Sequence, residues 1–203
     1  MTTATAATTT TTAGPSPIRA IGGVELPAAG TWLIDAGHTE VGFVGRHFGL
    51  TRIRGRFTGV EGAVTIGEDP ADSSVTTEID LRTVTSGSDA RDEHLRSPDF
   101  FDVDHHPTAT FRSTRLGVAG PTARLEGELT LKGVTAPVTL EVDYLGHAAD
   151  PWGGDRAVFS ARGRINREDW GLTWNMPLAA GGLLVSKEIT LTIEAELVRQ
   201  TSE

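Results

Sequence analysis

The chain contains no cysteine, which excludes disulfide bonds, thiolate nucleophiles and cysteine-based zinc sites together. It has no apolar run approaching the ~20 residues that a membrane-spanning helix needs. Dense basic clusters are missing too, since 18 lysines and arginines stand against 27 acidic residues and the net charge is −9. We therefore expect no nucleic-acid partner and no membrane-spanning segment. The fold must be held together by packing.

The beginning of the chain differs in composition from the rest. Residues 1–12 are almost wholly threonine and alanine, and prolines and glycines follow up to residue 30. Such a composition has too little apolar surface to offset the entropy of ordering, so residues 1–29 are predicted to be a disordered tail and residues 30–203 a single domain. Because the tail lacks a basic start and an apolar centre, it does not resemble a secretory signal, and a cytoplasmic location is expected.

After residue 31 the dominant hydrophobic period is two. In residues 123–132, Ala123, Leu125, Leu129 and Leu131 share one face while charged and polar residues share the other. This pattern is typical of a half-buried antiparallel strand, because parallel sheets show continuous apolar runs instead. The remaining expected strands are residues 31–35, 40–46, 53–66, 75–81, 108–116, 138–144, 157–165 and 189–197, with 132–137 as a tight hairpin connection.

Two architectures suit these strands, a closed barrel and a two-layer sandwich. We favour a closed, all-β antiparallel barrel of about eight or nine strands, because Gly55, Gly59 and Gly62 permit bends in residues 53–66. Inward positions are mostly aliphatic, with Phe57, Phe111 and Phe159 as large exceptions, and aromatic residues make up only 6% of the chain. A barrel of this size is filled by side chains or holds one ligand, and this composition permits a cavity.

A polar insert interrupts the strands. Ser86 or Ser88 is a suitable N-cap, acidic residues follow in the first turn, and Pro98 ends the segment, which predicts a short helix near residues 89–96. On it Arg91, His94 and Leu95 share a face directed into or over the barrel mouth. Asp92 and Arg96 are expected to form an ion pair in solvent. Of Phe100 and Phe101, at least one is expected to pack inward as a plug.

Arg91 and His94 offer donors suited to an anionic or carbonyl head group. The alternative is structural, with an arginine paired to an aspartate and a histidine satisfied within the fold. A second polar cluster holds His38, Glu40, Arg46 and His47, and only folding could bring its histidines to His94.

No metal site or nucleophilic catalytic site is expected. The adjacent His105 and His106 project oppositely in an extended chain, and the other histidines form no tight ligand pair. No Gly-x-Ser-x-Gly elbow is present, and the glycine pair at 181–182 lacks the lysine and spacing of a phosphate loop. Trp170 and Trp174 either line a lipid-accepting mouth or close the core around a loop, and we favour the core.

Short motifs in a fixed order resemble the YceI-like family of lipocalin-like, polyisoprenoid-binding proteins over residues 31–198. The motifs are Trp32-Leu-Ile-Asp35 with His38, Val41-Gly-Phe43 with Arg46-His47, Ile53-Arg-Gly55-Arg-Phe57, Arg91-Asp92-x-His94-Leu95 with Asp99-Phe100-Phe101, Pro107-x-Ala-Thr-Phe111, Gly127-Glu-Leu129 with Lys132-Gly133-Val134-Thr135, and Asn166-Arg167-x-Asp169-Trp170-Gly171-Leu172.

The resemblance implies an extended eight-stranded barrel that holds a long isoprenoid or similar amphiphilic chain. Each five-carbon unit could contribute roughly 3–4 kcal/mol, at ~0.8 kcal/mol per buried CH₂, before the cost of binding. The expected function is non-catalytic binding, carriage or sequestration of an isoprenoid or fatty-chain lipid without a cofactor, by a protein that could be a homodimer. The expected ligand-binding residues are Phe43, His47, Phe57, Ile79, Leu81, Arg91, His94, Leu95, Phe100, Phe101, Phe111, Leu129, Phe159, Trp170 and Trp174.

Two other functions stay open at this point. One is an enzyme acting on a hydrophobic small molecule, with His94 or His47 as general acid or base and Arg91 stabilising charge. The other is a fully packed barrel whose partners are proteins. Lipid carriage and the enzyme both require a cavity, whereas the fully packed barrel has none.

Overall fold

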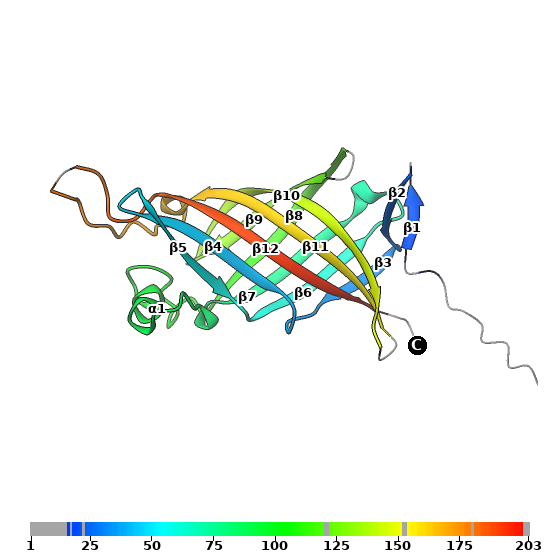
Figure 1. The fold of residues 1–203 in the computed structure, drawn as a ribbon, viewed down its shortest axis with the longest axis horizontal. Helices are drawn as coiled ribbons and strands as arrows, with labels where there is room; N and C mark the ends of the chain where they lie inside the picture. The colour runs from blue at the N-terminus through cyan, green and yellow to red at the C-terminus, as the bar shows by residue number, and fades with distance from the viewer. Residues whose placement is uncertain are drawn as a thin grey trace, which may run out of the picture.

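The computed structural model describes residues 16, 18–21, 23–119, 122–151, 154–179 and 181–200. Most of them belong to antiparallel strands, as the period of two predicts (Figure 1). None of the helices in these ranges has the length and apolar character needed to cross a bilayer. The strands are β1 (Ile18–Ile21), β2 (Val24–Pro27), β3 (Gly30–Ile34), β4 (Glu40–His47), β5 (Thr51–Phe57), β6 (Val60–Ile66), β7 (Ser74–Asp80), β8 (Thr108–Ala119), β9 (Thr122–Leu131), β10 (Val134–Ala149), β11 (Asp155–Asn166) and β12 (Glu188–Arg199).

Ten of these strands close into one barrel. The sheet runs β11-β10-β9-β8-β7-β6-β3-β12-β4-β5, and β11 also pairs with β12, which closes the circuit. One edge of β12 pairs with β3 near its C-terminus and with β4 nearer its N-terminus, so β3 and β4 share one position in the wall. In the same way β6 pairs with β3 and β5 pairs with β4. The wall therefore has eight positions, as the family resemblance implies.

The predicted strand 53–66 is wrong in one respect, because Thr58 and Gly59 divide it into β5 and β6. A Cβ at Gly59 would lie 2.8 Å from the Thr83 methyl carbon and 3.0 Å from the Asp80 Cβ, so the chain packs tightly there. The glycines thus permit a bend, as expected. The predicted connection 132–137 is shorter than expected, since Lys132 and Gly133 alone form the turn, both with positive φ, and β10 starts at Val134.

The β7–β8 connection carries α1 (Asp89–Arg96), preceded by the 3₁₀ turn η2 (Leu81–Thr83). This matches the predicted helix, and Ser88 stands at its N-cap without a side-chain capping bond. The connection lies at one end of the barrel, where β5 pairs with it at the Arg56–Thr85 bridge. The loop containing η3 (Arg167–Trp170) lies at the same end, whereas η1 (Pro70–Asp72) lies at the other (Figure 1).

Strands β1 and β2 pair as a hairpin at the end of the barrel opposite α1 (Figure 1). The predicted disorder of residues 1–29 is therefore wrong for residues 18–21 and 24–27, while residues 1–15, 17 and 22 lie outside the described residues. Long-range contacts hold the hairpin, because Arg19 donates hydrogen bonds to the Glu68 backbone carbonyl at 2.8 Å and to the Glu68 carboxylate at 3.0 Å. Composition alone could not reveal these partners.

Candidate functional site

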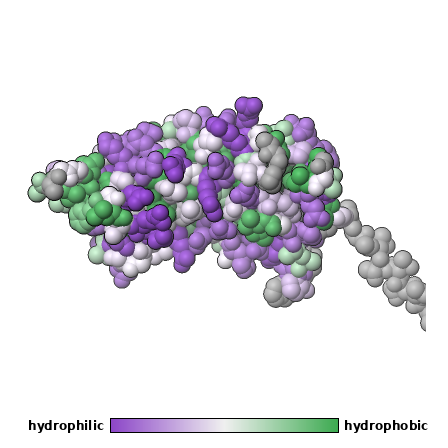
Figure 2. Space-filling model, turned by 45° about the horizontal axis from the view of Figure 1, so that its top comes forward, coloured by the Kyte–Doolittle hydropathy of each residue, from purple (hydrophilic) through white to green (hydrophobic). Residues whose placement is uncertain are grey.

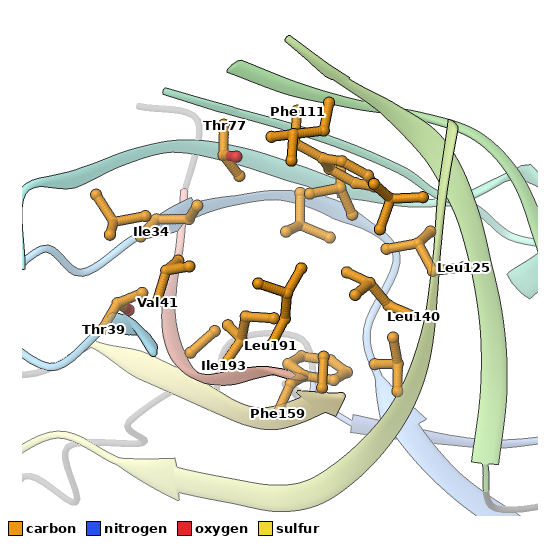
Figure 3. Close-up of a pocket in the computed structure, with 18 of the residues that line it drawn as sticks. Ile34, Thr39, Val41, Thr77, Phe111, Leu125, Leu140, Phe159, Leu191 and Ile193 are labelled. Atoms are coloured by element: carbon orange, nitrogen blue, oxygen red, sulfur yellow. The ribbon is translucent and has the colours of Figure 1, made fainter. Parts of the chain in front are cut away.

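A cavity of about 390 Å³ runs through the barrel from the α1 end to the β1–β2 end. Its volume falls within the ~300–1,000 Å³ typical of ligand pockets. The labelled side chains in Figure 3 reach into this space from opposite walls, and Thr39 and Thr77 are the only polar residues among the ten labelled. Inward positions of the alternating strands supply the lining, including the four β9 residues 123, 125, 129 and 131 that the sequence placed on one face. We call this cavity the bore.

Phenylalanine rings form part of the wall near the α1 end. The Phe57 ring centroid lies 5.6 Å from that of Phe43 and 5.3 Å from that of Phe101, at distances typical of aromatic pairs. The Phe43 ring lies over Gly55 on the neighbouring strand, where an added Cβ would stand 2.2 Å from a ring carbon. This glycine lets the ring lie against the wall, which leaves the centre of the bore open.

Arg167 is an uncompensated buried charge that lines the bore at the α1 end. Only 4% of its surface is exposed. Its Nε donates a hydrogen bond to the Ser186 carbonyl at 3.0 Å and its Nη1 donates to the Leu172 carbonyl, whereas Nη2 has no partner. Burial lowers the pKa of this guanidinium, and nearby Glu168, which is paired with Lys187 at 2.8 Å, opposes that shift only in part.

Two further buried polar atoms without partners belong to bore-lining residues, namely Tyr144 Oη and Arg19 Nε. Burial raises the pKa of the Tyr144 hydroxyl, with a smaller contribution from Glu25 of β2. Every unpaired buried side-chain polar atom in the described part of the chain thus belongs to the bore lining. Because such atoms are rare in native proteins, the bore is the place where a ligand's polar atoms would find donors.

Eight of the predicted site residues line the bore: Phe43, Phe57, Ile79, Leu81, Phe101, Phe111, Leu129 and Phe159. Phe101 is the inward plug that the sequence predicted, and Phe100 is buried beside it. The other predicted residues are not part of the lining: His47, Arg91, His94, Leu95, Phe100, Trp170 and Trp174.

The polar insert is built differently from the prediction. Arg91 donates from Nε to the Ser86 hydroxyl at 2.7 Å and from Nη2 to the Ser86 carbonyl at 2.8 Å, so it fixes the loop before α1. His94 lies beside the barrel, with Nε2 2.9 Å from the Asp99 carboxylate and its ring 4.6 Å from that of Trp174. Leu95 packs against the core. These contacts match the structural alternative for His94, whereas Arg91 has a structural role through Ser86 and not through the expected aspartate.

The expected solvent ion pair between Asp92 and Arg96 is wrong. Asp92 is 5% exposed and accepts hydrogen bonds from the backbone N–H and the hydroxyl of Ser86. Arg96 donates to the Arg82 carbonyl at 3.1 Å and to the Val84 carbonyl at 2.9 Å. Both side chains hold the β7–β8 connection in place, because its backbone groups need hydrogen-bond partners that the strands do not supply.

The remaining predicted residues lie outside the lining. The His47 ring packs at a tilt against Phe48 with centroids 3.9 Å apart, next to a bridge from His47 to Val185. Trp170 is 1% exposed and donates from its indole to the Leu129 carbonyl at 2.9 Å, so it closes the core as we favoured. Trp174 packs on Phe100 with ring centroids 5.4 Å apart.

A cluster of carboxylates that the sequence did not predict surrounds Arg156 at the β1–β2 end. Its guanidinium lies 2.5 Å from both Asp35 and Glu196 and 2.6 Å from Asp150, and these carboxylates raise its pKa. The Arg156 hydrogen bond is the largest cause that lowers the pKa of Asp35 to about 2. Asp35, His38 and Glu196 have ligand atoms within 4.8 Å of one another, but Arg156 already binds both carboxylates. This cluster joins three segments of the wall.

Sequence reasoning missed many of the lining residues. Alternation was the available signal for the aliphatic ones, such as Leu140, Leu191 and Ile193, which stand at inward positions of predicted strands. Arg167 belongs to the Asn166-Arg167-x-Asp169-Trp170 motif, but nothing there indicated burial, since it follows a strand and resembles an ordinary surface arginine in the sequence. Its burial depends on η3 and the loop that follows.

The sequence profile of the YceI-like domain matches residues 32–197. Among curated proteins, YceI of Escherichia coli is 38% identical over 164 residues, which cover 80% of this chain and 83% of that protein. A UPF0312 protein of Pseudomonas aeruginosa is 37% identical over the same length and with the same coverage.

Solved structures share the fold. BcnA of Burkholderia cenocepacia superposes with a TM-score of 0.68 at 21% identity, covering 80% of this chain and 98% of BcnA. A polyisoprenoid binding domain from Saccharophagus degradans superposes with a TM-score of 0.61 at 18% identity, covering 83% of this chain and 98% of that domain. At these identities the likeness concerns the fold.

Proposed function

Because the chain belongs to the YceI-like domain family, we propose that it binds and carries a long isoprenoid or similar fatty chain in the bore, without catalysis. The observation that carries the proposal is the bore itself, an apolar cavity with unpaired polar atoms on its lining residues. The structurally similar polyisoprenoid binding domain of Saccharophagus degradans supports an isoprenoid as the chain.

The hydrocarbon chain of the lipid would supply most of the affinity. Each CH₂ removed from water contributes ~0.8 kcal/mol, and the aliphatic lining offers contacts along the whole bore. A few polar groups then fix the orientation of the ligand, as in most ligand pockets. We propose that Arg167 Nη2 binds the head group, because it is a buried cationic donor without a partner. A carboxylate would satisfy both the donor and the charge.

The enzyme alternative requires His94 or His47 beside the bound molecule. Neither residue lines the bore, and both have contacts outside it. Arg91, the proposed stabiliser of charge, is held by Ser86. Carriage therefore has more support than turnover.

Native mass spectrometry of gently purified protein tests the proposal. We expect a bound lipid in the wild type, and after its removal we expect farnesol or farnesoic acid at 100 times its dissociation constant to raise Tm by about 5–10 °C. Ala161→Trp should abolish both signals by filling the bore, since Ala161 lines it. Ala90→Trp on the exposed surface of α1 is the matched control and should retain them. Empty wild-type protein without any thermal response would refute carriage.

A further inference from the structure

Four arginines gather on the outer surface of the barrel near the α1 end. Arg46 of β4 lies directly opposite Arg52 of β5, Arg54 follows on the same face, and Arg164 of β11 lines the same shallow hollow. Glu188 is the one acidic residue among the residues that line this hollow. We call Arg46, Arg52, Arg54 and Arg164 the arginine face.

Elsewhere on this barrel, outward arginines face acids. Arg112 lies opposite Glu128 and Arg115 opposite Glu126 across β8 and β9. Like charges directly opposite each other destabilise a strand pair, whereas opposite charges stabilise it. None of the four arginines forms an ion pair within the described ranges, although acids outnumber bases in the chain by 27 to 18. Repulsion among the four arginines thus destabilises the folded protein locally, and an anionic partner would offset this repulsion.

An apolar surface adjoins the arginine face. Phe48 and Leu50 in the β4–β5 turn are 50% and 80% exposed, and Met176 and Leu183 in the loop before β12 are 54% and 38% exposed. The two segments lie side by side, because the Phe48 N–H donates a hydrogen bond to the Leu184 carbonyl at 2.9 Å. Both project at the left end of Figure 1, and Figure 2 shows hydrophobic residues gathered at that end. We call these four residues the apolar tip.

We propose that the arginine face and the apolar tip dock the protein on a bilayer that contains anionic phospholipid. Arg46 and Arg52 are each two residues from a tip residue, about 7 Å along a strand. Apolar groups of peripheral proteins enter a bilayer by about 5–10 Å, so the guanidinium groups would stand at the level of the phosphates. A nucleic acid would suit the arginines alone and would leave the tip in water. The inference goes beyond carriage and does not depend on it.

Vesicle co-sedimentation of the full chain tests the docking. We expect the wild type to bind vesicles of phosphatidylcholine mixed with phosphatidylglycerol, to bind pure phosphatidylcholine far less, and to dissociate as salt rises. The double variant Arg46→Gln/Arg52→Gln should weaken binding by roughly 10-fold or more. Arg112→Gln/Arg115→Gln changes the net charge equally on another wall without placing two acids opposite each other, and this matched control should bind like the wild type.

The apolar tip has its own variant. Leu50→Ser should weaken binding to vesicles by roughly 5-fold or more even at low salt, because a leucine side chain that enters the bilayer contributes affinity independently of charge. Leu50 is 80% exposed, so the fold should tolerate this change. The proposal would be overturned if vesicle binding did not depend on phosphatidylglycerol, or if both double variants lost the same amount of vesicle binding. Binding to an oligonucleotide but not to vesicles would overturn it as well.

Discussion

Arg156 and Arg167 stand at opposite ends of β11 and show two uses of the same side chain. Arg156 contacts three carboxylates from separate segments, whereas the Arg167 guanidinium contacts two backbone carbonyls and leaves one nitrogen unpaired toward the apolar interior. The half-buried charge of Arg156 is fully paired and holds the wall together. A buried charge without a counterion costs stability in the empty protein and marks a place where an anion would bind.

Replacement of Arg156 should produce the largest change in stability. Arg156→Met leaves Asp35, Asp150 and Glu196 close together without their cation, and we expect the free energy of unfolding to fall by about 2–3 kcal/mol. Thermal unfolding measures the loss. Affinity for farnesoic acid should stay within about 2-fold of the wild type once the variant is folded, because Arg156 is not among the bore-lining residues. A large loss of affinity would remove the contrast between the two arginines.

Replacement of Arg167 should affect binding instead. We expect Arg167→Met to weaken the binding of farnesoic acid by about 10–100-fold, because hydrogen bonds to charged groups contribute about 1.5–3 kcal/mol. Farnesol has the same chain without the carboxylate, so titration calorimetry should show a much smaller loss for it. Equal losses for the acid and the alcohol would mean that Arg167 only supports the loop through Ser186 and Leu172.

Acid should weaken the ion pairs around Arg156 and so lower the free energy of unfolding. The pKa of Asp35 lies at about 2 in the folded protein, below its ordinary value of 3.8. The stabilisation is therefore complete above about pH 4 and is lost as the pH falls towards 2, by up to about 2 kcal/mol. Denaturant unfolding between pH 5 and pH 2 should show this slope in the wild type and a shallower one in Arg156→Met. Parallel slopes would contradict the assignment.

The smallest effect should come from Tyr144. Its buried hydroxyl has no partner, so Tyr144→Phe should stabilise the empty protein by about 1 kcal/mol. Chemical denaturation after lipid removal measures the gain. If the variant is instead less stable, the hydroxyl has a favourable contact in the empty protein and the comparison of paired with unpaired polar groups would need revision.

The sequence could predict whatever each strand displays locally. Alternation in residues 123–131 placed four residues correctly on the inward face, and the capping pattern placed α1. Contacts between distant segments could not be predicted in this way. Arg156 meets Asp35 across 121 residues and Glu196 across 40, and no periodicity records such a meeting. Asp92 resembles a solvent carboxylate on a short helix until the turn at Ser86 folds over it.

The central claim is that the bore holds an apolar chain whose head group lies at Arg167. A crystal structure with hexadecanoic acid brominated at its methyl end tests it most directly, because the anomalous signal of bromine locates the end of the chain. The account predicts a bromine peak inside the bore, displaced from Arg167 towards the β1–β2 end, with the carboxylate within hydrogen-bonding distance of Nη2. A bromine peak beside Arg167, or a fatty acid bound only outside the barrel, would contradict it.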